Sequence, residues 1–149
     1  MHKKINLRKI NLTDLKILFN WRNDDKTRRN SLNTKKIGLK EHTEYLKKLI
    51  RDPNKNQYIL EINSNPVATL TELKLDNKKS QLSYNVDPEQ RGKKIGQLLL
   101  NTYLSKRTGI FVCNIKNSNI PSIKMIEKIG FSLTRNNEDI CIYELNKEN

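Results

Sequence analysis

The spacing of apolar residues changes several times along the chain, and each change marks the passage from a strand to a helix or back. Alternating or short continuous apolar stretches predict strands at residues 4–10, 57–62, 67–75, 79–86, 109–115, 131–135 and 140–145. Apolar residues at helical spacing predict helices near residues 14–25, 39–51, 95–104 and 122–129. The sequence contains no internal repeat, low-complexity block or linker, so this order predicts one α+β domain over residues 1–149.

The first predicted helix begins with Thr13 as its N-cap and ends in the polar residues 22–25, directly after Trp21. Two interpretations of this end stay open. Either Trp21 is a core residue beside solvated charges, or the polar cluster is a substrate-facing rim on which Arg22 binds an anion. Residues 26–36 show no period and are expected to form a loop.

The second predicted helix carries apolar residues and one histidine on a single face. That face consists of His42, Tyr45, Leu46, Leu49 and Ile50. A histidine in this position is either a partly buried core residue or a group that touches substrate, because histidine is also the commonest general base.

A basic, glycine-containing loop joins the strand 79–86 to the helix that follows it. Pro88 ends the strand because it lacks an N–H group. Unpaired backbone N–H groups and the positive end of the helix dipole then converge on residues 91–96, where Gly92 and Gly96 allow a close backbone approach. This arrangement favours a phosphate or pyrophosphate, although a capped turn that binds nothing has the same pattern. The basic side chains of the loop are those of Arg91, Lys93 and Lys94.

The chain is strongly basic, with a formal net charge of +13. Such a charge fits nucleic acid, an anionic membrane or a polyanionic small molecule. The lysines are spread over nearly every segment together with many Asn and Ile, a usage typical of an AT-rich genome, so the charge alone selects none of the three. No apolar run is long enough to cross a bilayer, and no signal peptide is indicated. Cys113 and Cys141 make no metal set and are expected to be reduced core residues of a cytoplasmic protein.

Two segments together resemble the signatures of the GCN5-related N-acetyltransferase (GNAT) superfamily. The first is Arg91-Gly92-Lys93-Lys94-Ile95-Gly96, in which Lys94 replaces the family's middle glycine. The second runs from Asn119 to Gly130-Phe131. The resemblance extends over essentially the whole chain. It implies the GNAT fold, in which a twisted, mixed and mostly antiparallel sheet of about seven strands is flanked by four helices and has splayed central strands.

The same resemblance implies acetyl-CoA as co-substrate and no metal. Its pyrophosphate would lie on the backbone amides of Arg91, Gly92, Lys93, Lys94, Ile95 and Gly96. The pantetheine arm would pair with the strand end formed by Tyr84, Asn85 and Val86, and the other side of the site would be lined by Asn119 and Ser122.

The catalytic pair common in the family is missing from this sequence. The frequent thiolate-protonating Tyr corresponds to Ile126, and a frequent Glu of the central strand corresponds to Gln81. The titratable candidates that remain near the expected cleft are Glu72, Tyr84 and His42. A degenerate domain that binds CoA without catalysis is therefore an alternative.

The acceptor side is similar to the branch that acetylates nucleotide-linked amino sugars of the UDP-4-amino-deoxysugar type, as in the pseudaminic acid pathway. The similar segments are Trp21-Arg22-Asn23 and the helix around His42, and these four residues are the predicted substrate contacts. The runner-up is the ribosomal-protein N-terminal acetyltransferases, which are less suited because basic tails would meet a basic enzyme. A nucleic-acid binder comes third, because a basic recognition helix and an aromatic stacking platform are missing. We therefore expect a small-molecule amine as partner, no nucleic acid or membrane, and a monomer or homodimer.

Overall fold

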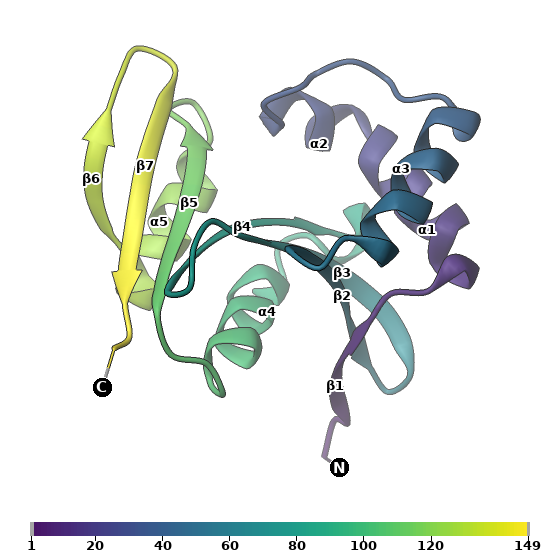
Figure 1. Cartoon of the computed structure of the whole chain (residues 1–149), viewed down its shortest axis with the longest axis horizontal. Helices are drawn as coiled ribbons and strands as arrows, with labels where there is room; N and C mark the ends of the chain where they lie inside the picture. The colour runs from purple at the N-terminus through teal and green to yellow at the C-terminus, as the bar shows by residue number, and fades with distance from the viewer. Residues whose placement is uncertain (1, 149) are drawn as a thin grey trace.

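One twisted sheet runs through the molecule, and a computed structural model describes it for residues 2–148 (Figure 1). The seven strands follow one another across the sheet in the order β1-β2-β3-β4-β5-β7-β6. Their bounds are Ile5–Lys9 for β1, Lys55–Ile62 for β2, Asn65–Lys74 for β3, Lys79–Val86 for β4, Ile110–Lys116 for β5, Ser132–Asn136 for β6 and Ile140–Asn146 for β7. The helices are α1 (Leu15–Asn23), α2 (Asp25–Asn30), α3 (Leu39–Arg51), α4 (Ile95–Leu104) and α5 (Ile120–Ile129), with short 3₁₀ turns η1 (Leu12–Asp14) and η2 (Pro88–Gln90).

The centre of the sheet is open, because β4 and β5 pair over only part of their length. They form the one parallel pair in the described sheet, and its register covers only Lys79–Gln81 against Ile110–Val112. Beyond Gln81 the two strands diverge, with β1–β4 on one side of the opening and β5, β7 and β6 on the other (Figure 1). The predicted α+β architecture with splayed central strands is confirmed.

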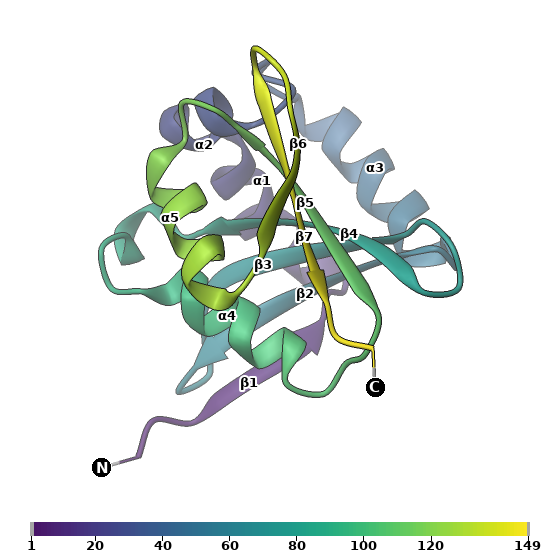
Figure 2. The ribbon, with the colours of Figure 1, turned by 90° about the vertical axis from the view of Figure 1, so that its left-hand side faces the viewer.

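Helices cover both faces of the sheet, so the core has two parts (Figure 2). The larger part packs α4 and α5 against one face and includes Leu82, Leu99 and the fully buried Ile126. The smaller part packs α1 and α3 against the other face around Trp21, Leu46 and Ile59. Cys113 and Cys141 are both buried and unbonded to each other. None of the helices within residues 2–148 is long and apolar enough to span a bilayer.

The segment 26–36 is not entirely a loop, as the sequence had suggested, because α2 extends to Asn30. Asp24 ends α1 with extended backbone angles and then caps α2 by accepting a hydrogen bond from the Thr27 N–H at 3.1 Å. The sequence of α2, DKTRRN, contains no apolar residue, so apolar spacing could not indicate this helix. On the face predicted for the next helix, α3, Tyr45 and Ile50 are exposed.

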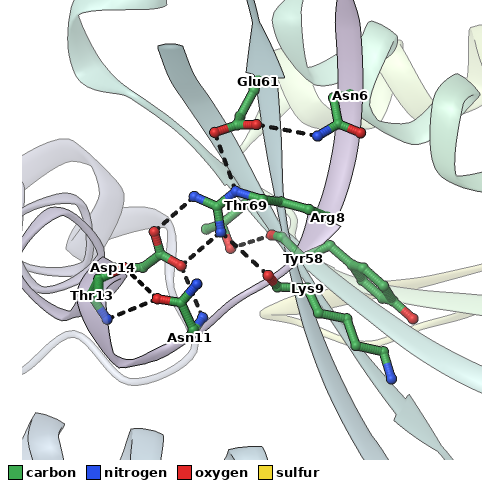
Figure 3. Close-up of polar contacts among 9 residues, drawn as sticks. All are labelled: Asn6, Arg8, Lys9, Asn11, Thr13, Asp14, Tyr58, Glu61 and Thr69. Carbon is green, nitrogen blue, oxygen red and sulfur yellow. Dashed lines mark hydrogen bonds and ion pairs between the residues drawn. The ribbon is translucent and has the colours of Figure 1, made fainter. Parts of the chain in front are cut away.

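The start of the first helical segment is capped by Asn11, so the prediction of Thr13 was wrong. The Asn11 side chain accepts a hydrogen bond from the Thr13 N–H at 2.9 Å, and Asp14 returns one by accepting from the Asn11 N–H at 2.9 Å (Figure 3). This reciprocal pair is a capping box, which fixes the entry into η1 and α1.

Asp14 also anchors this helix start to the sheet through Arg8 on β1 (Figure 3). The two carboxylate oxygens of Asp14 accept from Arg8 Nη1 and Nη2 at 2.9 and 2.8 Å, while Arg8 Nε lies 3.2 Å from a Glu61 oxygen. Asp14 is only 5% exposed. The hydrogen bond from Arg8 holds the pKa of the Asp14 carboxyl below its usual range, against the opposing effect of burial.

Replacing Asp14 with Asn should lower the free energy of unfolding at pH 7 by about 2–3 kcal/mol, because a charged, buried hydrogen-bond partner of Arg8 is lost. A lowered folded pKa stabilises the fold above the unfolded value and ceases to do so as the pH falls through the folded value. The deficit of D14N in urea unfolding should therefore shrink below about pH 4. The control is D25N, which breaks an exposed ion pair with Arg28 and should cost at most about 1 kcal/mol. Equal losses in the two variants would contradict this account.

Candidate active site

The loop after β4 is shaped by two residues with left-handed backbone angles. Asp87 caps η2 by accepting from the Glu89 N–H at 3.0 Å, and the chain then turns at Gly92 with φ +79°. Lys94, directly before α4, has φ +60° and ψ +29°. No side chain caps the first N–H groups of α4. These groups are therefore free to bind an anion at the positive end of the helix.

Lys94 thus adopts a left-handed conformation that favours glycine, at a cost of about 1–2 kcal/mol for a residue with a side chain. Gly96 also has a role in packing. A Cβ there would lie 2.9 Å from Met125 Sδ and 3.7 Å from Val86 Cγ2. Its missing side chain therefore lets α4 approach α5 and β4.

Tyr84 links the two sides of the opening. Its hydroxyl is hydrogen-bonded to Ser122 Oγ on α5. Burial raises the pKa of Tyr84, so the phenol is protonated at neutral pH and is a weaker acid than an exposed tyrosine. Burial likewise raises the pKa of the Cys113 thiol on β5 to about 12.

The other donor-side residues of the prediction lie around the same opening. Asn85 and Val86 follow Tyr84 at the end of β4, and Ile95 turns its buried side chain into the core. Asn119 precedes α5, with its N–H donating to the Lys116 carbonyl at 2.9 Å. Lys93 Nζ lies 3.4 Å from Gln90 Oε1 at the rim of the loop.

Arg22 of α1 and His42 of α3 form a second polar centre. Each has one buried nitrogen, Arg22 Nη1 and His42 Nε2, that finds no hydrogen-bond partner among residues 2–148. The other terminal nitrogen of Arg22 donates to the Asn33 carbonyl at 2.9 Å, and the His42 ring lies 5.6 Å from the Phe19 ring. Burial first, and the Arg22 charge second, lower the pKa of His42. Buried polar groups without partners are rare and costly, which makes this pair a candidate binding site.

Trp21 and Asn23, which the sequence grouped with Arg22, have structural contacts instead. Trp21 is 4% exposed and packs in the smaller core. The Asn23 amide donates to the Ile37 carbonyl at 2.8 Å and accepts from the Ile37 N–H at 2.9 Å, which fastens the loop before α3 to the end of α1.

Glu72 lies away from both the loop after β4 and the Arg22–His42 pair. Its carboxylate accepts from the Tyr103 hydroxyl and, at 2.9 Å, from the Asn56 amide, and it lies 3.9 Å from Arg107 Nε. It borders a cavity of about 1020 Å³ that the loops 51–55, 74–79 and 106–108 surround, at the opposite end of the strands from the loop after β4. A carboxylate with all these partners favours a structural role.

Arg91 also has a contact that the sequence did not indicate. Its guanidinium forms an ion pair with Asp24, between α1 and α2, instead of extending freely from the loop. The two residues are 67 positions apart, so no local spacing predicts the pair.

Comparisons with known proteins agree with this fold. The profile of the acetyltransferase (GNAT) family matches residues 15–131. Acetyltransferase PseH of Campylobacter jejuni strain 81-176 is 21% identical over 150 residues, covering 95% of this chain and 94% of that protein. The crystal structure of C. jejuni N-acetyltransferase PseH has a TM-score of 0.76 at 20% identity and covers 97% of this chain and 99% of that chain. Spermidine N-acetyltransferase from Vibrio cholerae, in complex with CoA and spermine, has a TM-score of 0.85 at 15% identity, covering 96% and 95%.

The lowered pKa of His42 predicts a pH dependence of stability. Below the unfolded pKa of about 6.5 the unfolded chain binds a proton that the folded chain does not. Stability is therefore complete above that value and should fall as the pH decreases, by at most about 1.4 kcal/mol per pH unit. Urea unfolding between pH 7.5 and 5 should show this slope in the wild type and in H2Q, which removes the exposed second histidine, but not in H42Q. An unchanged slope in H42Q would refute the assignment.

Proposed function

Because the chain belongs to the acetyltransferase (GNAT) family and is an N-acetyltransferase, we propose that it moves the acetyl group of acetyl-CoA to a primary amine of an anionic small molecule. The preferred acceptor is a nucleotide-linked amino sugar of the UDP-4-amino-deoxysugar type. The observation that carries this choice is the buried Arg22 nitrogen without a partner. A planar guanidinium suits phosphate oxygens, which bind it through paired hydrogen bonds.

The donor is supported by the loop after β4 and by the open edge of β4 itself. The uncapped N–H groups at the start of α4, with Lys93 and Lys94 beside them, suit a pyrophosphate. Residues 82–86 of β4 pair with β3 on one edge and not with β5 on the other. Their backbone groups are therefore available to the amides of a pantetheine arm, as in strand addition. The CoA complex of the V. cholerae neighbour supports the same ligand class.

The charge of the chain supports an anionic acceptor over a cationic one. The chain has a formal net charge of +13. Part of the positive charge lies in the loop and short helix next to Arg22, which contain Lys26, Arg29, Lys35 and Lys36. A polyamine such as spermidine, or a basic protein N-terminus, would approach like charge, which opposes encounter. An anionic acceptor gains from the same field. The resemblance to PseH points to a sugar nucleotide within that class.

The proposed reaction forms a C–N bond and breaks a C–S bond. The amine nitrogen attacks the thioester carbonyl, and the sulfur departs with the bonding electron pair and takes up a proton. We assign that proton to the Tyr84 hydroxyl, which contacts Ser122, and the phenolate then regains a proton from water, to which the amine has given one. The amine proton leaves through water or to His42, which its lowered pKa keeps neutral at pH 7. Proximity supplies much of the rate, because the usual Tyr is the buried Ile126.

Thiol release from acetyl-CoA, measured with a panel of amines, tests the function. The panel contains UDP-linked 4-amino sugars, spermidine and basic N-terminal peptides. We expect turnover with the sugar nucleotides. Turnover with spermidine or peptides alone would overturn the acceptor class, and CoA binding without turnover on any amine would identify a degenerate domain.

Replacing Arg22 with Ala should raise the acceptor KM by about 10- to 100-fold, because a hydrogen bond to a charged group contributes about 1.5–3 kcal/mol. The KM for acetyl-CoA should stay within about threefold of the wild-type value. The matched control is R29A, which removes the same charge from an exposed position on α2. If R22A raised both KM values equally, Arg22 would not be an acceptor contact.

A further inference from the structure

An ion pair crosses from the donor loop to the acceptor side of the molecule. Arg91, in the loop after β4, contacts Asp24 Oδ2 through Nη2, and the same nitrogen lies 3.2 Å from Thr27 Oγ1. Asp24 is the residue between α1 and α2. The side chains of Arg91 and Asp24 are only 34% and 24% exposed, so water screens the pair incompletely.

Asp24 has a second task at the same time. Its Oδ2 accepts from the Thr27 N–H at 3.1 Å and from the Thr27 hydroxyl at 3.2 Å, and so caps α2. Although burial opposes ionisation, the hydrogen bond from Arg91 lowers the pKa of Asp24 below its usual range. One carboxylate therefore joins the start of α2 to the loop that precedes α4.

The far end of α2 is held from the other side of the opening. Lys116 Nζ, at the end of β5, donates to the Arg29 carbonyl at 2.7 Å. The helix is thus tied to the β4 side through Asp24 and to the β5 side through Arg29, and Figure 1 shows it facing β5 across the gap. Arg28 Nε adds a bond to the Asn23 carbonyl at 3.2 Å, which fixes α2 to the end of α1 next to Arg22.

We propose that Asp24 is a positioning residue that couples the donor loop to α2 through Arg91. This inference rests on the proposed donor site. A pyrophosphate on the loop fixes Arg91, Arg91 fixes Asp24, and Asp24 fixes α2 together with the adjoining end of α1 that carries Arg22. The acceptor side is then ordered by the arrival of acetyl-CoA.

The guanidinium of Arg91 has enough donors to serve both partners. It carries five N–H groups, and within the described chain only those on Nη2 are engaged. Nε and Nη1 are left for a phosphate oxygen while Nη2 keeps Asp24. The alternative arrangement is a switch, in which Arg91 must release Asp24 before it can bind phosphate.

Amide hydrogen exchange with and without CoA separates these arrangements and needs no acceptor. In the wild type we expect saturating CoA to slow exchange across residues 25–30 severalfold. D24N should lose this protection, although Asn still caps a helix as well as Asp does. R91Q, which leaves the Asp24 cap intact, should lose it too. The matched control D25N removes the same charge one residue later, where the pair with Arg28 is exposed, and should keep the protection.

Calorimetry with CoA supplies the second measurement. If Asp24 positions α2, D24N should bind CoA within about threefold of the wild-type Kd. Binding that is tenfold tighter in D24N would show that Asp24 withholds Arg91 from the phosphate and would overturn the proposal. Retained CoA-dependent protection of α2 in D24N would overturn it as well. A wild-type protein that binds no CoA would instead refute the donor site, and the coupling with it.

Discussion

The short pairing between β4 and β5 is the constraint on which the rest of the structure depends. Two strands at the centre of a sheet normally satisfy each other's backbone groups along their whole length, yet here the register stops at Gln81 and Val112. The opening leaves a row of backbone donors and acceptors at the end of β4. The left-handed turn at Lys94 then directs the first N–H groups of α4 to the same place. The proposed donor site therefore depends on a local failure of strand pairing.

Charge and burial organise the opposite face of the sheet. Arg22 and His42 are brought together by two helices that pack against the opposite face of the sheet, and each retains a buried nitrogen without a partner. The neighbouring Trp21 and Asn23 hold those helices and the following loop in place. Arg22, the proposed acceptor contact, thus lies between two residues with structural contacts at the end of α1. A basic surface around such a pair suits an acceptor that carries negative charge.

Elements with several turns of apolar spacing, or with a glycine at their end, were predictable from the sequence. The helix α3 has the expected bounds. The helix α5 ends at Ile129, as predicted, and is followed by Gly130 with φ +121°. Interactions that depend on tertiary structure were not predictable. The helix α2 contains no apolar residue, and the contact of Arg91 with Asp24 joins residues far apart in the chain. The unpartnered nitrogens of Arg22 and His42 could be found only from the structure. The spacing of residues in a helix predicts which side chains share a face, but it does not predict how far each atom is buried.

The short pairing between β4 and β5 also affects how the chain folds. The hairpins β2–β3–β4 and β6–β7 close short loops, which is entropically cheap and fast. The parallel junction must wait for the crossover through α4 and yields only the pairs from Lys79 to Gln81 with Ile110 to Val112. This pairing forms few hydrogen bonds, although it requires the closure of a long loop through α4. The two halves of the sheet are therefore expected to form first and to be joined late, with the packing of Gly96 against Met125 as part of that final closure.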